Sequence, residues 1–131
     1  MTPAAHTPKP HADRRRQRQR SERLGRIAEL AAAAFMMLKG YRILGRRVRT
    51  RYGELDLITI RGRRLAIVEV KYRQTLEAAK LAITHAQADR VATAAEQWAG
   101  ARPAYRDLHL GLDAIYLAPW RLPRHEMDAL H

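Results

Sequence analysis

The 131-residue sequence predicts a layered α/β fold in which one sheet has helices on both faces. Two neighbouring apolar segments within residues 53–73 have the length and composition of paired strands. Both faces of these strands are largely apolar, which is typical of a sheet covered on two sides. Helical patterns precede and follow them in the chain, giving the order α, three β, α, β.

The first helix is expected from Ser21, a candidate N-cap residue, to the glycine at position 40. Its apolar residues recur at helical spacing up to Leu38. Glu29 is the only ionisable residue between Ile27 and Leu38, so we expect it near or inside the packed region. The alternative is that Glu29 lies on the wet edge of an alanine-rich helix.

A short strand is expected next, over residues 41–50, and Gly45 is a candidate bulge within it. After the paired strands, Thr84 and Gln87 have the spacing of a capping box and predict a second helix at about 85–99. Residues 110–119 predict a last strand, ended by proline. The segment after it is too short to classify.

The paired strands predict their own register. A two-residue type II′ turn at positions 62–63, with glycine first, places Asp56 directly opposite Glu69. Leu55 and Leu57 then share the other face of the hairpin. Two carboxylates in such a pair have Cβ atoms roughly 5 Å apart, which is destabilising unless one is protonated or both share a cation.

The same register places Glu54 opposite Lys71, which supplies part of the missing positive charge. Asp56, Glu69 and a candidate third acid, Glu29, still outnumber this one base. An excess of carboxylate suits a hard divalent cation, and Mg²⁺ is favoured because it needs only one or two carboxylates. Against this stands the frequency with which short acidic triplets occur by chance.

Composition limits the class of protein. Lys and Arg number 25 against 13 Asp and Glu, giving a formal charge of +12 and a sequence pI of about 11.1, which favours phosphate backbones or acidic surfaces as partners. The absence of cysteine excludes disulfides and thiolate metal sites. No signal core or apolar span is evident, so we expect a cytoplasmic protein with no membrane contact.

Residues 1–20 differ from the remainder of the chain. They contain three prolines, almost no large apolar residue and five arginines within seven positions. Such a segment buries too little surface to offset its ordering entropy, so we expect a flexible basic arm before a domain at 21–131. The arm is either a nucleic-acid contact or a solubilising leader.

The motif "GELDLI" followed by "LAIVEVKYR" resembles the signature of the YraN-like family, which is similar to Holliday-junction resolvases of the PD-(D/E)xK nuclease superfamily. Further similarity lies in "GRIAELAAAAFMMLKGYRIL", "AITHAQADRV" and "LGLDAIYL", so the resemblance covers about residues 24–130. It implies a restriction-endonuclease-like three-layer fold with a central mixed sheet flanked by helices.

The resemblance also implies roles for individual residues. Asp56 corresponds to the metal-binding aspartate, Glu69 to the second acid and metal ligand, and Lys71 to the catalytic lysine. Glu29 corresponds to the acid on the first helix, whereas Glu54 matches a position without an agreed role. These residues would hydrolyse phosphodiester bonds with Mg²⁺ or Mn²⁺.

Two positions depart from the family pattern. Gln87 stands where the second helix of the family usually has a lysine. Two roles remain open for Gln87: it supports the phosphate or metal site, or it only completes the capping box. Leu112 replaces an aromatic residue before Asp113, which we regard as structural. Backbone contacts to nucleic acid are expected from Gln87 and the basic residues before the acidic strand, namely Arg42, Arg46, Arg47, Arg49 and Arg51.

Three function classes follow. The first is a Mg²⁺-dependent nuclease acting on DNA, including branched or structured DNA. The second is a non-catalytic nucleic-acid-binding module with a vestigial acidic site. The third is a basic adaptor that docks to an acidic protein or the ribosome. The sequence leaves DNA versus RNA open, and it leaves open whether the chain forms a homodimer.

Overall fold

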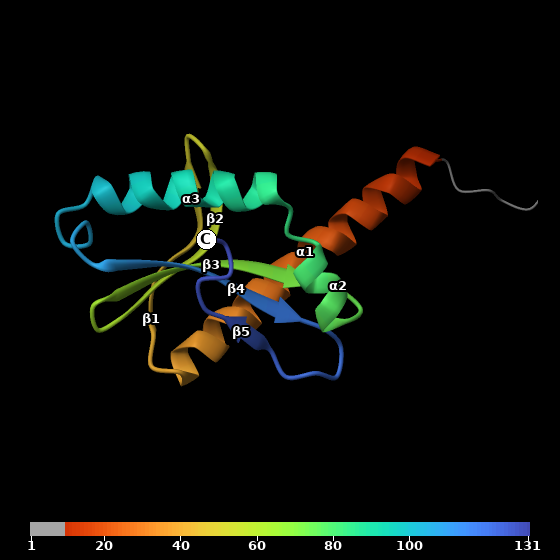
Figure 1. The fold of residues 1–131 in the computed structure, drawn as a ribbon. Helices are drawn as coiled ribbons and strands as arrows, with labels where there is room; N and C mark the ends of the chain where they lie inside the picture. Colours follow the sequence, from red (N-terminus) through yellow and green to blue (C-terminus); the bar gives the residue numbers. More distant parts are fainter. Residues whose placement is uncertain (1–9) are drawn as a thin grey trace, which may run out of the picture.

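The computed structural model describes residues 10–131 and shows a five-stranded sheet with helices on both faces (Figure 1). Among these residues, none of the helices combines the length and apolar character needed to cross a bilayer. In chain order the elements are α1 (Pro10–Leu38), β1 (Arg42–Thr50), β2 (Gly53–Arg61), β3 (Arg64–Tyr72), α2 (Leu76–Leu81), α3 (His85–Gly100), β4 (His109–Leu117) and β5 (Arg124–Glu126).

The strands lie in the order in which they occur in the sequence. β1, β2 and β3 form an antiparallel meander, β4 lies parallel to β3, and β5 returns antiparallel to β4. The parallel pair requires a crossover, which α2 and α3 provide. The sheet is therefore mixed, as predicted, and the architecture is that of a restriction-endonuclease-like α/β fold.

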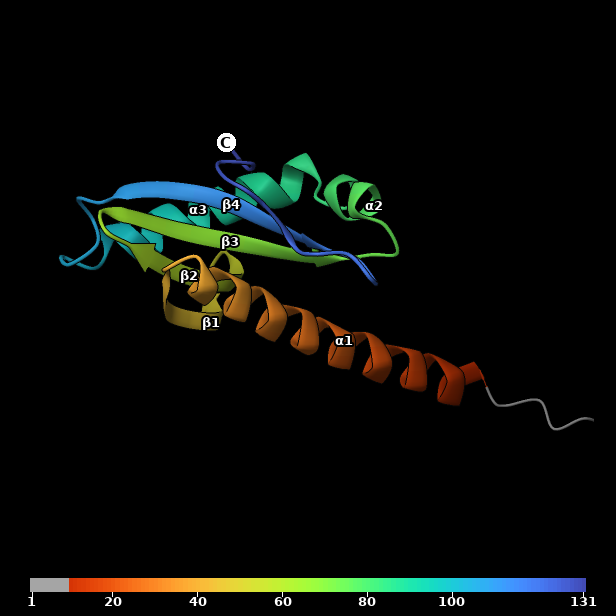
Figure 2. The same cartoon turned by 90° about the horizontal axis from the view of Figure 1, so that it is seen from below.

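Two apolar clusters fill the spaces between the layers. Along one face of the sheet, α1 buries Ala32 and Met36 against Leu57 and Val68. Along the other, α3 buries Val91 and its neighbouring alanines against Ile58, Ile67 and Leu112. Figure 2 shows the two helices on opposite sides of the strands. This arrangement confirms the prediction that β2 and β3 are covered on both faces.

Helix α1 begins at Pro10, so the expected start at Ser21 is wrong. The residues from 12 to 20, expected to belong to a flexible arm, are helical and exposed, and α1 projects well beyond the sheet (Figure 2). Arg, Gln and Ala are good helix formers, and the packed half of α1 supplies the nucleus from which a helix extends. Residues 1–9 of the predicted arm lie outside the described residues, and the division at residue 20 stays a prediction.

The predicted hairpin register is confirmed for the residue pairs between the turn and Leu57. Arg61 pairs with Arg64 and Ile58 with Ile67, and Gly62 has φ +60°, as the first residue of a type II′ turn requires. The bulge in β1 also lies where expected, between Ile43 and Gly45. The capping box of α3 is present. The short elements α2 and β5 were not predicted.

One strand face was predicted wrongly. Leu57 packs towards α1, but Leu55 packs with Ile58 on the α3 side. The regular alternation of β2 is broken at Asp56, and the β1–β2 ladder lacks a pair between Asp56 and Arg47, a residue with φ +52°. This irregularity lies beside the acidic residues described next.

Candidate acidic site

A pocket of about 300 Å³ lies between α1 and the ends of β2 and β3. Its lining brings together Glu29 from α1, Asp56 from β2, and Glu69 and Lys71 from β3. These are the four residues that the family resemblance implies for catalysis. The helix packs on this face because of its apolar residues, so Glu29 is carried to the pocket and is buried there, as predicted.

Asp56 lies where the β2–β3 ladder ends, one residue beyond the Leu57–Val68 pair. Its Oδ2 accepts a hydrogen bond from the amide nitrogen of Val70 at 2.8 Å. Burial raises the pKa of Asp56, while the Val70 amide and the charge of Lys71 act in the opposite direction. The side chain is thus fixed by the backbone of the neighbouring strand.

Glu69 is buried beside Asp56, and its pKa is raised to about 7, first by burial and then by the Asp56 charge. The two carboxyl groups share a side-chain hydrogen bond that favours the protonated form of Glu69. Nζ of Lys71 lies 3.6 Å from Oε1 of Glu69 and partly opposes this effect. The predicted direct pairing of Asp56 with Glu69 is absent from the ladder, which ends at Leu57 and Val68, but the two acids still lie close enough for the Asp56 charge to raise the pKa of Glu69.

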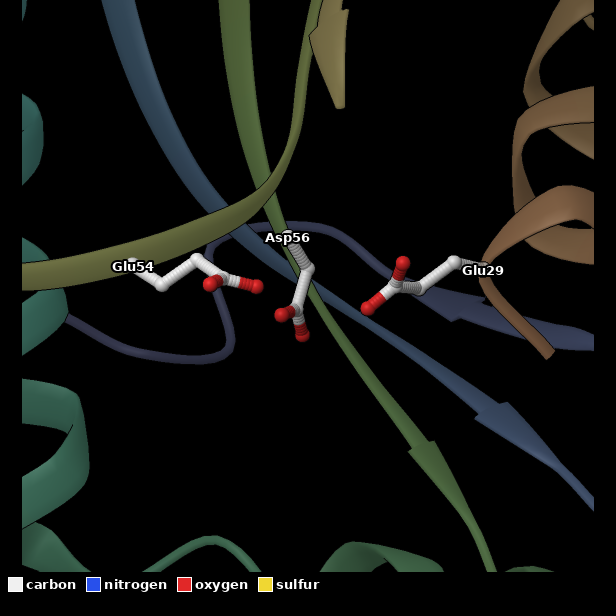
Figure 3. A group of neighbouring side chains, drawn as sticks. All are labelled: Glu29, Glu54 and Asp56. Carbon is white, nitrogen blue, oxygen red and sulfur yellow. The ribbon is translucent and has the colours of Figure 1, made fainter. Parts of the chain in front are cut away.

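Asp56 also lies close to two other acids, Glu29 and Glu54. One carboxylate oxygen from each of Glu29, Glu54 and Asp56 lies within 4.8 Å of the other two. Figure 3 shows Glu54 and Glu29 directing their carboxylates towards Asp56 from opposite sides. Glu69, predicted as a metal ligand with Asp56, is not a member of this group. Asp56 belongs to both arrangements, and Glu54 gains a place that the sequence had left undefined.

Arg47 takes part in the same cluster. Its Nε lies 2.7 Å from Oε2 of Glu29. Burial and the Asp56 charge raise the pKa of Glu29, and Arg47 partly offsets this rise. Arg47 was predicted as a nucleic-acid contact, which stays a prediction, because its side chain remains 41% exposed while it pairs with Glu29. The other arginines of that prediction have exposed side chains on or just after β1, namely Arg42, Arg46, Arg49 and Arg51.

Helix α3 shows one of the two roles that the sequence left open for Gln87. The side chain of Gln87 accepts a hydrogen bond from the Thr84 amide and completes the capping box. One turn later, the side chain of Arg90 crosses Gly53, where a Cβ atom would lie only 3.0 Å from Arg90 Cδ. The charge of Arg90 lowers the pKa of Glu69. Arg90 was missed because its sequence neighbourhood is that of an ordinary exposed helix position.

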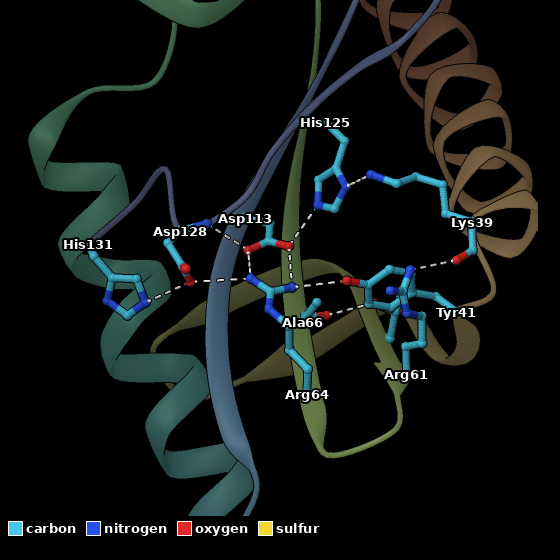
Figure 4. Close-up of polar contacts among 10 residues, drawn as sticks. Lys39, Tyr41, Arg61, Arg64, Ala66, Asp113, His125, Asp128 and His131 are labelled. Atoms are coloured by element: carbon cyan, nitrogen blue, oxygen red, sulfur yellow. Dashed lines mark hydrogen bonds and ion pairs between the residues drawn. The ribbon is translucent and has the colours of Figure 1, made fainter.

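Asp113 belongs to a separate buried network (Figure 4). It accepts two hydrogen bonds from Arg64, at 2.6 and 2.7 Å, one from the Asp128 amide and one from His125 Nε2 at 2.7 Å. Burial alone would raise the pKa of Asp113, but these donors hold it well below its usual range. The contacts join β3, β4 and β5, in agreement with a structural role.

The mixed sheet, the helices on both faces and the acidic pocket define a restriction-endonuclease-like α/β protein. The chain belongs to the family described as "Uncharacterised protein family UPF0102", whose sequence model matches residues 28–124. The predicted YraN-like membership is thereby confirmed.

Relatives in this family are similar over most of their length. A UPF0102 protein of Rhodopseudomonas palustris (strain BisB18) is 46% identical over 92% of this chain and 89% of its own. A UPF0102 protein of Nitrobacter winogradskyi is 47% identical over 80% of this chain and 89% of its own. A UPF0102 protein of Caulobacter vibrioides (strain NA1000 / CB15N) is 49% identical over 83% of this chain and 87% of its own.

Proposed function

We propose that this protein is a Mg²⁺-dependent nuclease that hydrolyses phosphodiester bonds in DNA, including branched or otherwise structured DNA. One observation carries the proposal: Glu29, Asp56, Glu69 and Lys71 come from three separate elements and line one pocket. Buried acids with raised pKa values that converge beside a lysine in one pocket are typical of a functional site.

The donor set fits a hard divalent cation. Glu29, Glu54 and Asp56 offer only carboxylate oxygens, the ligands that Mg²⁺ and Mn²⁺ prefer, and they lie close together. When bound, such a cation would polarise the phosphate and make a bound water more acidic. Arg47 supplies positive charge to Glu29 from the protein itself.

The other two residues handle the water and its proton. Lys71 lines the pocket and can orient the attacking water or a phosphate oxygen by donating hydrogen bonds. Glu69, with a pKa raised to about 7, is suited to accept a proton from that water near neutral pH. The water oxygen would bond to phosphorus while one P–O ester bond breaks, and the leaving oxygen would take up a proton from solvent water.

The basic half of α1 supports nucleic acid as the substrate. Ser21, Leu24 and Gly25 line the acidic pocket, so the projecting part of the helix starts at the pocket itself. Its exposed arginines are Arg14, Arg15, Arg16, Arg18, Arg20, Arg23 and Arg26. A DNA strand whose scissile phosphate lies in the pocket would therefore pass beside these arginine side chains.

A cleavage panel tests the proposal. Linear duplex, single-stranded, flap and four-way-junction DNA are incubated with Mg²⁺, Mn²⁺ or EDTA, and we expect cutting of at least one substrate only with metal. Lys71→Ala should abolish cutting while retaining binding. Lys80→Ala is the matched control, because Lys80 is exposed on α2 and lies outside the acidic pocket. Cutting by Lys71→Ala at the wild-type rate would refute the mechanism.

A second candidate function is a nucleic-acid-binding module whose acidic site is vestigial. The Arg47–Glu29 ion pair favours it, because that guanidinium already neutralises one acid of the cluster. This candidate predicts binding that is unaffected by Asp56→Asn and no cleavage of any substrate with excess Mg²⁺ or Mn²⁺.

A further inference from the structure

We propose that the loop between β4 and β5 carries a second nucleic-acid site, in which Trp120 stacks on an unpaired base of a single strand. The inference rests on the proposed nucleic-acid function and specifies the kind of substrate. It concerns a surface on another part of the molecule from the acidic pocket, defined here as the Trp120 surface: Phe35, Lys39, Leu76, Trp120, Arg121, Leu122, Arg124 and His125.

Trp120 is unusual in its exposure. It lies fully in solvent, at 101% of its reference area, although tryptophan side chains are normally mostly buried. Its backbone has φ +62°, a conformation that bulky residues rarely adopt and that costs of order 1–3 kcal/mol. The fold thus holds a large aromatic ring in water at an energetic cost, which is typical of a binding residue.

The ring stands beside a hollow of about 660 Å³ with an apolar wall and a basic rim. Phe35 from α1, Leu76 and Leu122 give the apolar part, whereas Arg121 lies in the loop and Arg124 is the first residue of β5. Within residues 10–131, neither of these two arginines forms an ion pair with a carboxylate. An aromatic ring between free cations complements a base attached to its phosphates.

The loop is anchored at both ends, so the ring is presented in a fixed place. Before it, β4 runs through the centre of the core, and after it Arg124 pairs with Tyr116. His125 is fixed on one ring nitrogen by Asp113 and on the other by Lys39, which follows α1 (Figure 4). A prearranged platform loses little entropy when it binds a partner.

A single strand fits this surface better than a duplex, because stacking requires a base whose face is free. Lys39 directly follows the last residue of α1 and lies about 15 Å beyond Glu29 along the helix axis. That separation corresponds to about four nucleotides of a stacked strand. A substrate with unpaired bases a few nucleotides from the scissile bond would reach both places, which deepens the proposal of branched DNA.

Intrinsic fluorescence gives a direct test. The chain has two tryptophans, and Trp98 is half-buried and stacks on Tyr105, so Trp98→Phe keeps an aromatic stack and leaves Trp120 as the only tryptophan reporter. We expect a short oligothymidylate, added in EDTA, to quench this emission strongly at low salt. Unchanged emission at oligonucleotide concentrations that saturate binding would overturn the proposal.

A second measurement uses surface variants that leave the core untouched. Trp120→Ala should weaken binding of a dye-labelled oligothymidylate about tenfold or more, in line with the removal of one stacked base. Leu81→Ala is the control, since Leu81 is also exposed but lies on α2. Equal affinities of the two variants for the oligothymidylate would overturn the proposal. Both assays run without metal, so failed cleavage by the wild type bears on the nuclease proposal alone.

Discussion

The carboxylate of Asp56 accepts a hydrogen bond from the main-chain nitrogen of Val70, on the neighbouring strand. A side chain thus takes the place of a strand carbonyl at the point where the β2–β3 ladder stops. The strands separate beyond this point, and the space between them and α1 becomes the acidic pocket. The same carboxyl group therefore ends the ladder and supplies the central acid of the site.

Asp56→Asn should melt no lower than the wild type in EDTA, because the amide oxygen of asparagine can still accept from Val70 while the buried negative charge is removed. Asp56→Ala should be less stable by about 1–3 kcal/mol, since it leaves that amide without an acceptor. Thermal unfolding of the three proteins measures both effects. A strongly destabilised Asp56→Asn variant would identify the acid as a folding feature.

Mg²⁺ at about ten times its dissociation constant should stabilise the wild type by roughly 1.4 kcal/mol and Asp56→Asn much less. The titration is followed by thermal melts and repeated with an uncleavable duplex, because phosphate oxygens complete the preferred octahedral shell of the ion. No response in either condition would favour the binding-module function.

Glu69→Gln should stabilise the metal-free protein at high pH but not at low pH. Folding raises the pKa of Glu69 from its ordinary value of 4.5 to about 7, so the ionised side chain opposes folding once the pH exceeds 4.5. The advantage of glutamine should be absent below about pH 4.5, grow with rising pH and level off above about pH 7, at no more than roughly 3 kcal/mol. Melting curves in EDTA from pH 4 to 8 check this, and a pH-independent difference would contradict it.

Replacing Arg14, Arg15, Arg16, Arg18 and Arg20 with glutamine should weaken DNA binding across all sequences. The slope of log affinity against log salt should fall by about 0.9 for each duplex phosphate that the variant no longer neutralises. Glutamine maintains helix propensity, which circular dichroism can verify. Deleting residues 1–20 should lower the slope in the same way. The double variant Arg63→Gln with Arg106→Gln serves as the control, because both side chains are exposed and lie outside α1. An unchanged slope would show that this part of α1 is a passive leader.

Asp113→Ala should destabilise the fold by about 3–5 kcal/mol, because it leaves the Arg64 guanidinium without its buried partner. Urea unfolding measures the destabilisation, with the exposed Asp107→Ala as the matched control. The fraction that remains folded should keep its metal affinity, since the Asp113 network is separate from the acidic pocket. Weaker metal binding at unchanged stability would contradict the structural role.

Much of the fold was predictable because its signals are local. The hairpin register depended on Gly62 and its turn, and the start of α3 depended on Thr84 and Gln87, all within a few residues. The start of α1 was not predictable in this way. Its exposed first half has no apolar periodicity and is helical as an extension of the packed half.

The site was predictable in part. The family motif and the hairpin together indicated Asp56, Glu69 and Lys71, and the lone acid of an apolar helix indicated Glu29. The sequence could not show that Arg47 would pair with Glu29, because its left-handed backbone arises where β1 follows the irregular β2. Long side chains that reach across from another element leave no local pattern.

The contact between Lys39 and His125 joins positions 86 residues apart, whereas every acidic-pocket residue lies before position 74. Contacts of long sequence separation close late in folding, because the intervening chain must first be ordered. A chain that has formed its antiparallel meander and packed α1 against it already holds its acids in place, but the edge of β3 stays open until β4 arrives. During this interval Ile67 and Val68 of β3 lie on a strand edge whose backbone groups have no partner. Docking of β4 is therefore the folding step at which we expect wrong strand pairing most readily.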